Sequence, residues 1–193
     1  MASTATPYGL RLAKRLGETN QRHGFNQYKI ASGYATDLKV GDVVKLAVGG
    51  TLEKDTGTTA CTPIGVFMGC AYTDGSFGFV NKAQWAASTV ASDAMGYVLD
   101  DPDAIFQIQA NGTLGQNALN TNAALVQGSG SLTLGRSGVS LNAGTIAATA
   151  TLPVRIVGFI NIPGFSVMGD AYTDVLVRFN THVSRSTTGN AAS

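Results

Sequence analysis

The chain has 193 residues, a formal net charge of +1 and only 13% charged residues, about half the charged share of an ordinary soluble domain. No apolar run approaches the roughly 20 residues that cross a bilayer, so no membrane-spanning helix is expected. The length suffices to bury a core in one β domain or two small ones. The 24 glycines and the low charge are typical of a protein that other chains cover in an assembly.

The N-terminal region is basic, whereas the rest of the chain is slightly acidic. Through Ile30 there are five basic residues and one acidic residue, and the remainder carries eight basic and eleven acidic residues. Apolar residues between 8 and 17 are unevenly spaced and 17–26 is rich in turn residues, which predicts an extended segment. We therefore divide the chain into an extended arm, residues 1–26, that lies on an acidic partner, and a β-rich body, residues 27–193. The arm residues expected to make this contact are Tyr8, Leu10, Arg11, Lys14 and Arg15.

The first strands of the body are apolar runs separated by turn residues. In 41–52, three valines and a leucine precede Gly49-Gly50, which is a hairpin pattern. Residues 64–72 form a second apolar run, whose glycines permit a β-bulge. Two further strands, 95–99 and 104–110, flank an Asp-Asp-Pro-Asp sequence that is typical of a turn.

Between residues 111 and 148 the sequence is poor in aromatic residues and rich in small and polar ones. Its best regular element is a short helix over 116–126, where apolar residues recur at roughly helical spacing. This is the only helix that the sequence predicts in the body.

Strands return at 152–160 and 171–179, both rich in β-branched residues. In the last strand Val175, Val177 and Phe179 share one face, because side chains alternate along a strand. That face is predicted to be packed and the opposite face to be partly exposed.

Residues that could carry catalysis or bind a metal are few and scattered. The two histidines, His23 and His182, lie in polar terminal regions, so neither a catalytic triad nor a zinc site is expected. Cys61 and Cys70 lack metal-ligand spacing and are expected to be small core residues with free thiols. The acidic run 100–103 lacks the alternating spacing and the closing glutamate of a calcium loop.

Other functional patterns are equally incomplete. The sequence 128–131, Gly-Ser-Gly-Ser, is not a phosphate loop because no lysine follows Lys82. Nucleophile, base and orienting group are all missing, so we expect no enzyme, no cofactor and no bound metal. Nucleic-acid binding is not expected, because the body is slightly acidic and its aromatic residues lie in apolar strands. Trp85 is either a core residue, the favoured interpretation, or an anchor in an oligomer interface.

Several segments of the chain together carry a resemblance to one known group of proteins. They are PYGLR (7–11), NQYKIASGYAT (26–36), GDVVKL (41–46), IGVFMGC (64–70), DDP (100–102) with FQIQ (106–109), and LPVRIVGF (152–159). Distributed over nearly the whole chain, they resemble the capsid cement, or decoration, proteins of tailed bacteriophages.

This resemblance implies a mainly β protein without catalytic residues. The fold expected is a compact β-barrel or β-sandwich body, with a β-tulip-like arrangement as one form of it, an extended N-terminal arm and at most short helices. The protein would be made in the host cytoplasm and would sit on the capsid exterior as part of the virion. Its partners would be the major capsid protein and its own copies, as a homotrimer, with no nucleic acid and no membrane.

The function expected from the resemblance is mechanical. A clamp that binds only the expanded shell stabilises that shell by mass action against the packaged DNA, and a trimer that engages several capsomers gains through effective concentration. Two alternatives stay open. One is a carbohydrate-binding head fibre domain, for which Tyr72, Tyr172 and Trp85 are the aromatic candidates. The other is a tail-tube or minor structural subunit, which would assemble with itself.

Overall fold

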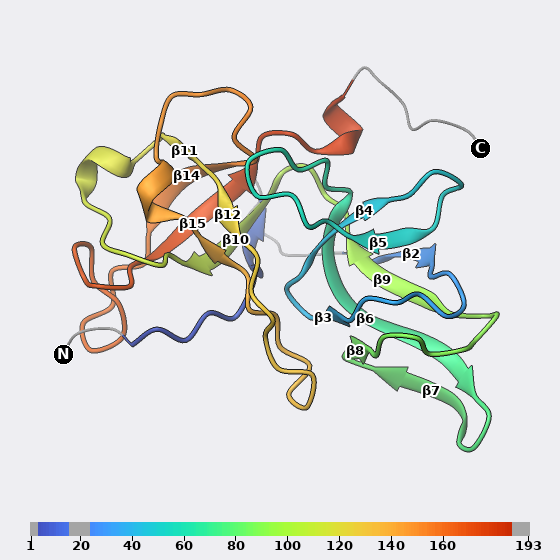
Figure 1. Ribbon diagram of the computed structural model, residues 1–193. Coiled ribbons are helices and arrows are strands. Elements are labelled where there is room, and N and C mark those ends of the chain that lie inside the picture. Colours follow the sequence, from blue (N-terminus) through green and yellow to red (C-terminus); the bar gives the residue numbers. More distant parts are fainter. Residues whose placement is uncertain (1–3, 16–23, 187–193) are drawn as a thin grey trace.

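A computed structural model describes residues 4–15 and 24–186, and the chain is mainly β, with 40% strand and 5% helix. Two antiparallel sheets form its two halves (Figure 1). The five-stranded sheet has the order β1 (Arg11–Arg15), β10 (Ala104–Gln109), β15 (Asp174–Phe179), β14 (Val154–Phe159) and β11 (Asn122–Ala123). The six-stranded sheet has the order β2 (Asn26–Lys29), β9 (Met95–Leu99), β6 (Gly65–Asp74), β4 (Val43–Leu46) and β5 (Leu52–Lys54), and β7 (Gly78–Lys82) pairs with β6.

The remaining elements are short. Two strand pairs are β3 (Leu38–Lys39) with β8 (Gln84–Trp85), and β12 (Leu125–Val126) with β13 (Ser140–Leu141). Three single-turn 3₁₀ helices are η1 (Gln116–Ala118), η2 (Ala143–Thr145) and η3 (Val183–Arg185). Within the described residues no barrel closes, so the mainly β prediction is confirmed as a compact body of several antiparallel sheets.

Each large sheet has its own hydrophobic core. One contains Phe106, Val177 and Phe179 from the five-stranded sheet, and the other contains Phe67 and Trp85 on the side of the six-stranded sheet. Strand β6 belongs to both, because Val66 packs in the first core and Phe67 in the second. A register shift between Phe67 and Gly69 marks the bulge that its glycines permitted.

Several sequence predictions are confirmed. The hairpin over 41–52 is formed by β4 and β5, and its turn is closed by a hydrogen bond from the Ala47 N–H to the Thr51 carbonyl at 2.8 Å. On β15, Val175, Val177 and Phe179 are buried, as predicted. The opposite face is partly exposed at Leu176, as expected.

The predicted helix over 116–126 is wrong. Only η1 is helical, Leu119 is already extended, and Asn120 adopts a left-handed φ of 62°. The following residues form β11, which pairs with β14, and β12, which pairs with β13. Ala118, Ala123 and Leu125 are buried in the first core, so the apolar pattern reflects burial in an irregular segment, and tertiary strand pairing outweighed the weak helical propensity.

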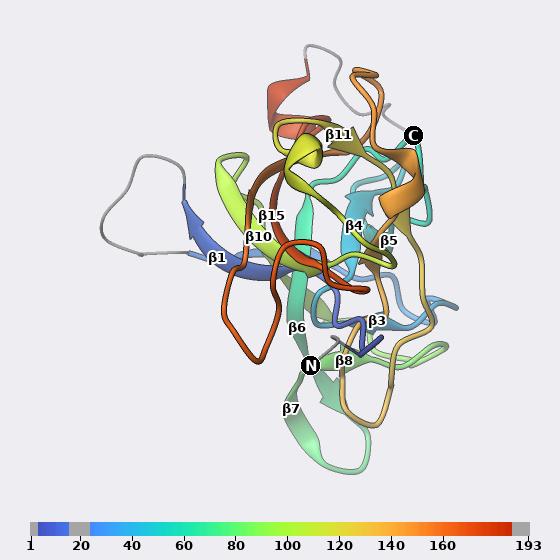
Figure 2. The ribbon, with the colours of Figure 1, turned by 90° about the vertical axis from the view of Figure 1, so that its left-hand side faces the viewer.

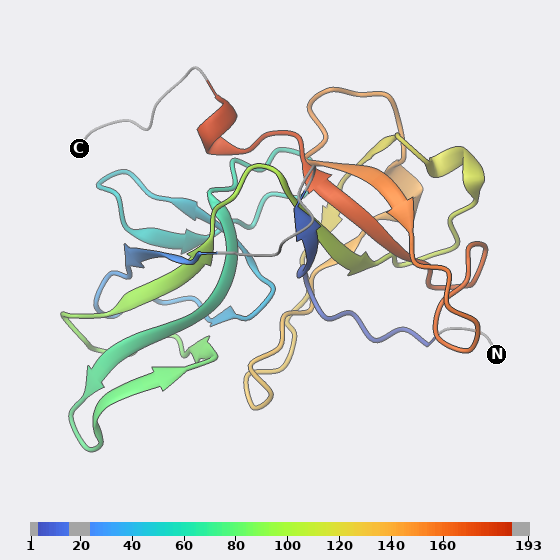
Figure 3. The same cartoon turned by 180° about the vertical axis from the view of Figure 1, so that it is seen from behind.

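Residues 4–15 pack on the body instead of forming a separate arm (Figure 3). They are extended, as predicted, and β1 pairs antiparallel with β10 at the edge of the five-stranded sheet (Figure 2). The Gly9 N–H donates to the Val139 carbonyl at 3.1 Å, and the Leu10 N–H donates to the Gly41 carbonyl at 3.0 Å. Of the rest of the predicted arm, residues 1–3 and 16–23 lie outside the described residues, and Asn26 already belongs to β2.

Gly9 allows the segment to approach the body closely. Its φ is +75°, and a Cβ at this position would lie 2.6 Å from the Gly41 carbonyl oxygen and 2.5 Å from the Ser137 Cβ. Gly33 has the same φ of +75° but open space around it, so it serves as a matched control for backbone strain alone.

We predict that Gly9→Ala destabilises the fold more than Gly33→Ala does. Both changes place a side chain in a left-handed conformation, which costs about 1–2 kcal/mol, and Gly9→Ala adds an overpacking cost of about 1–3 kcal/mol. Urea unfolding of both variants measures the difference. Equal losses would mean that residues 4–15 are not docked in solution.

Candidate functional site

The predicted contact residues of the arm separate into a buried pair and an exposed pair. Tyr8 and Leu10 are 6% and 1% exposed, and Leu10 belongs to the first core. Arg11 and Lys14 are exposed on β1. Arg15 is the last residue of β1.

Tyr8 is held from two sides. Its hydroxyl donates a hydrogen bond to the carboxylate of Asp174, which is itself buried. Burial, followed by the bond to Asp174, raises the pKa of Tyr8 well above its ordinary value, so the phenol stays protonated. The guanidinium of Arg11 lies over the ring, 4.3 Å from its centroid, a cation–π contact that orients Arg11 outward.

The expectation that Tyr8 and Leu10 are apolar anchors for a partner is therefore corrected. These side chains fill the chain's own core, because the extended segment finds an edge strand and an apolar pocket within the same molecule. Of the predicted contact residues, Arg11 and Lys14 stay exposed.

Trp85 is a core residue and not an interface anchor. It is fully buried, packs edge-on against Tyr72 with ring centroids 5.4 Å apart, and donates from Nε1 to the Tyr34 carbonyl at 3.4 Å. Tyr72 is only 3% exposed. Of the three aromatic residues considered for sugar binding, Tyr172 alone is partly exposed.

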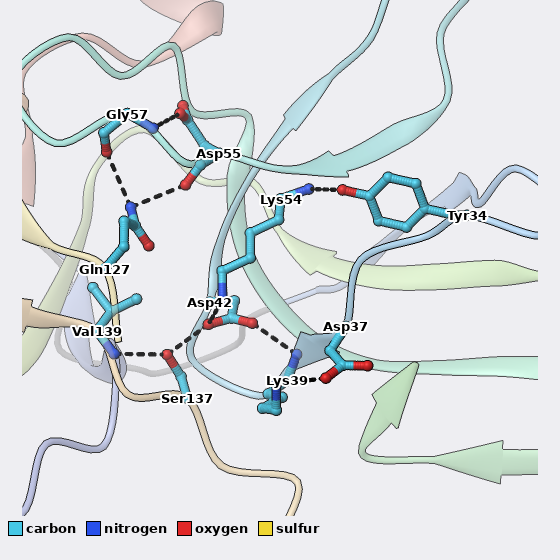
Figure 4. A network of polar contacts seen from close by, with 10 residues as sticks. All are labelled: Tyr34, Asp37, Lys39, Asp42, Lys54, Asp55, Gly57, Gln127, Ser137 and Val139. Carbon is cyan, nitrogen blue, oxygen red and sulfur yellow. Dashed lines mark hydrogen bonds and ion pairs between the residues drawn. The ribbon is translucent and has the colours of Figure 1, made fainter. Parts of the chain in front are cut away.

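A buried polar network lies between the two halves (Figure 4). Its centre is the carboxylate of Asp42, which is fully buried. Lys54 Nζ lies 3.1 Å from Asp42 Oδ1, the Ser137 hydroxyl donates to the same oxygen at 2.7 Å, and the Lys39 N–H donates to Oδ2 at 2.9 Å. Both carboxylate oxygens are thus satisfied, as a buried charge requires.

The network extends from Asp42 to the segment that holds the arm. Ser137 Oγ accepts a hydrogen bond from the Val139 N–H at 3.1 Å, and the Val139 carbonyl accepts the Gly9 N–H. Nearby, Gln127 Nε2 donates to the carbonyls of Asp55 and Gly57, both at 3.0 Å.

A serine beside a carboxylate and a lysine resembles a catalytic arrangement, but its burial argues against catalysis. Asp42 and Ser137 are both 0% exposed, and the Ser137 hydroxyl is already used as donor and acceptor. A substrate cannot reach this serine, so the network is structural. The only sequence signal for it was an aspartate placed between apolar residues in the run Lys39 to Val44.

Besides the Asp42 network, a surface hollow of about 540 Å³ lies next to η3, away from the predicted arm residues. It is lined by Cys61, His182 and Arg185 among others. Burial raises the pKa of the Cys61 thiol to about 12, so the thiol is protonated at neutral pH and is a weak nucleophile. Burial also raises the pKa of Cys70, to about 11, and both cysteines are free and buried, as expected.

Every aspartate of the chain accepts a hydrogen bond from another residue of the chain. They are Asp37, Asp42, Asp55, Asp74, Asp93, Asp100, Asp101, Asp103, Asp170 and Asp174. By contrast, Arg11, Lys14, Lys29 and Arg136 are exposed and make no ion pair with a carboxylate of the described residues. These four side chains are therefore exposed cations without an ion-pair partner among the described residues.

Residues 4–15 and 24–186 contain no group of three or more histidine, cysteine or acidic side chains placed to hold a metal ion. Within the same ranges, no helix is long and apolar enough to cross a membrane. Comparisons with family models, with curated proteins and with solved structures found no match to this chain.

We predict that Asp42→Asn costs about 3–5 kcal/mol of folding free energy, because it leaves the Lys54 ammonium buried without a counter-charge. Asp103→Asn is the control. It breaks the partly exposed pair with Arg185, and such pairs contribute about 0–1 kcal/mol. Urea unfolding of both variants measures the two losses. Similar losses would contradict the role of Asp42.

We also predict that stability falls as the pH drops below about 6.5, in part because of His182. The buried His182 Nδ1 accepts a hydrogen bond from the Ser184 N–H at 3.1 Å, which caps η3. Burial is the main cause that lowers its pKa below the ordinary 6.5. The unfolded chain therefore takes up the proton first, so stability is full above the ordinary pKa and is lost as the pH falls toward the folded pKa.

Urea unfolding of the wild type and of His182→Gln at pH values of about 7.5 and 5.5 tests this prediction. The difference in stability between the two pH values should shrink in His182→Gln. The other histidine, His23, is present in both proteins and cancels in the comparison. An unchanged difference would show that His182 does not contribute.

Proposed function

We propose that this chain is a structural protein of a tailed-bacteriophage virion that binds the exterior of the icosahedral head and cements neighbouring capsomers. The resemblance of the six segments described above supports the class of protein. The exposed cations carry the binding mode: Arg11, Lys14, Lys29 and Arg136 are exposed and make no ion pair with a carboxylate of the described residues. Such a surface fits a partner that presents acidic groups.

Exposed apolar side chains on loops also support a role in an assembly. Phe77 and Phe79, in and beside the β6–β7 turn, are 80% and 68% exposed, and Leu134 is 71% exposed. Ile162 and Phe165, in the loop between β14 and β15, are 55% and 54% exposed. Large exposed apolar groups are typical of surfaces that other chains cover.

The partners in this proposal are the major capsid protein and two further copies of the chain in a homotrimer. Each copy needs only weak contacts, because a trimer that engages several capsomers binds with a raised effective concentration. Selective binding to the expanded shell stabilises that state by mass action against the pressure of packaged DNA.

We predict that the purified chain is a trimer at micromolar concentration and co-sediments with expanded empty heads of the virus that encodes it, but not with unexpanded heads. Cryo-electron microscopy of intact particles should place the chain on the outer surface around the three-fold positions. Sedimentation velocity measures the oligomeric state.

Three outcomes would contradict the proposal. They are absence of the chain from the head surface, equal binding to both forms of the head, and a purified chain that stacks into rings, which is the behaviour of a tail-tube subunit.

A further inference from the structure

The outward face of the five-stranded sheet carries a row of cations. Side chains of β15 alternate, so Val175, Val177 and Phe179 point into the core and Leu176 and Arg178 point outward. Arg178 lies opposite Arg155 of β14, and Arg155 lies opposite Asn122 of β11.

The row continues across the sheet toward the N-terminal edge. Lys14 of β1 pairs with Ile105 of β10. Because Phe106 pairs with Val177, the preceding residue Ile105 lies beside Arg178 of β15. Arg11 pairs with Gln107 on the same face. We call Arg11, Lys14, Arg155 and Arg178 the basic sheet face; the sheet can be followed from behind in Figure 3.

Two arginines opposite each other repel and destabilise a sheet unless an anion lies between them. Arg155 Nε donates to Asn122 Oδ1 at 3.0 Å, which orients its guanidinium. Both arginines are partly exposed and make no ion pair with a carboxylate of the described residues.

The face also lacks an available acid of its own. Among the five strands of this sheet, Asp174 is the only acidic residue. It is 2% exposed, and its carboxylate accepts the hydroxyl of Tyr8. Within the described residues, Arg155, Arg178 and Lys14 therefore have no ion-pair partner in the strands of this sheet.

We propose that the basic sheet face is the docking surface for an extended acidic segment of a partner protein. Forked guanidinium groups bind carboxylates with two parallel hydrogen bonds. β1 is the edge strand of this sheet, and an edge is where an extended segment of a partner adds to a sheet.

A protein segment fits this face better than a nucleic acid does. The outward neighbour of Arg178 on β15 is the aliphatic Leu176, and the strands of the face present no aromatic side chain on it for base stacking. This inference rests on the proposed function only in taking the acidic segment to belong to the major capsid protein.

The isolated full-length protein tests the inference without virus particles. A fluorescent oligoglutamate peptide of about twelve residues is the probe, with an oligoglutamine peptide and a dT oligonucleotide of the same length as comparisons. Arg155→Gln with Arg178→Gln should weaken oligoglutamate binding about five- to thirtyfold at low salt, from the loss of two partly exposed ion pairs.

The matched control removes two partly exposed cations from the six-stranded sheet, Lys45→Gln with Lys82→Gln, and should change binding less than about twofold. A charge-preserving variant, Arg155→Lys with Arg178→Lys, should lose part of the affinity because lysine lacks the fork. Unfolding midpoints confirm that each variant is folded, and Arg178→Gln alone replaces the double variant if the latter does not fold.

Equal losses in the two glutamine double variants would overturn the inference, since the peptide would then follow overall charge. Tighter binding of the oligonucleotide than of oligoglutamate, lost in the same arginine variant, would also overturn it in favour of a nucleic acid. Neither outcome bears on whether the chain is part of the virion, which the imaging experiment decides separately.

Discussion

The two halves of this protein meet around one buried carboxylate. Asp42 is removed from water, where an unpaired charge would be very costly, so donors have to converge on it. Lys54 comes from the six-stranded sheet, and Ser137 comes from a segment 95 residues further along the chain that leads to β13. Satisfying this one group thus fixes the distance and orientation between the two hydrophobic cores.

The N-terminal segment is positioned by the same junction. Gly9 fits against Gly41 and Ser137, the neighbours of Asp42 in sequence and in space, and its N–H bonds to Val139. The chain that follows enters the five-stranded sheet as its edge strand β1. Basic residues that a free arm would have carried are therefore displayed on a rigid sheet, where their spacing is set by strand register.

The chain has few charged residues, and its aspartates accept hydrogen bonds within the chain. The aspartates accept hydrogen bonds in turns, at the buried junction and from Tyr8, so they help to shape the fold. The surface carries exposed cations without an ion-pair partner among the described residues, and exposed aromatic side chains such as Phe77. Such a surface suits a protein that contacts acidic and apolar surfaces of other chains.

Local patterns in the sequence were sufficient for the class of fold, the β4–β5 hairpin, the bulged strand β6 and the packed face of β15, because alternation and turn residues act over a few residues. They failed for 116–126, where an irregular segment buries its apolar residues in the core. They also failed for Tyr8, which was expected to be an exposed anchor. The burial of Tyr8 depends on Asp174, 166 residues away. The basic sheet face likewise joins residues from β1, β14 and β15. Only the tertiary structure brings such distant residues together, because strand order and register are decided by the burial of whole sheets and not by neighbours in the chain.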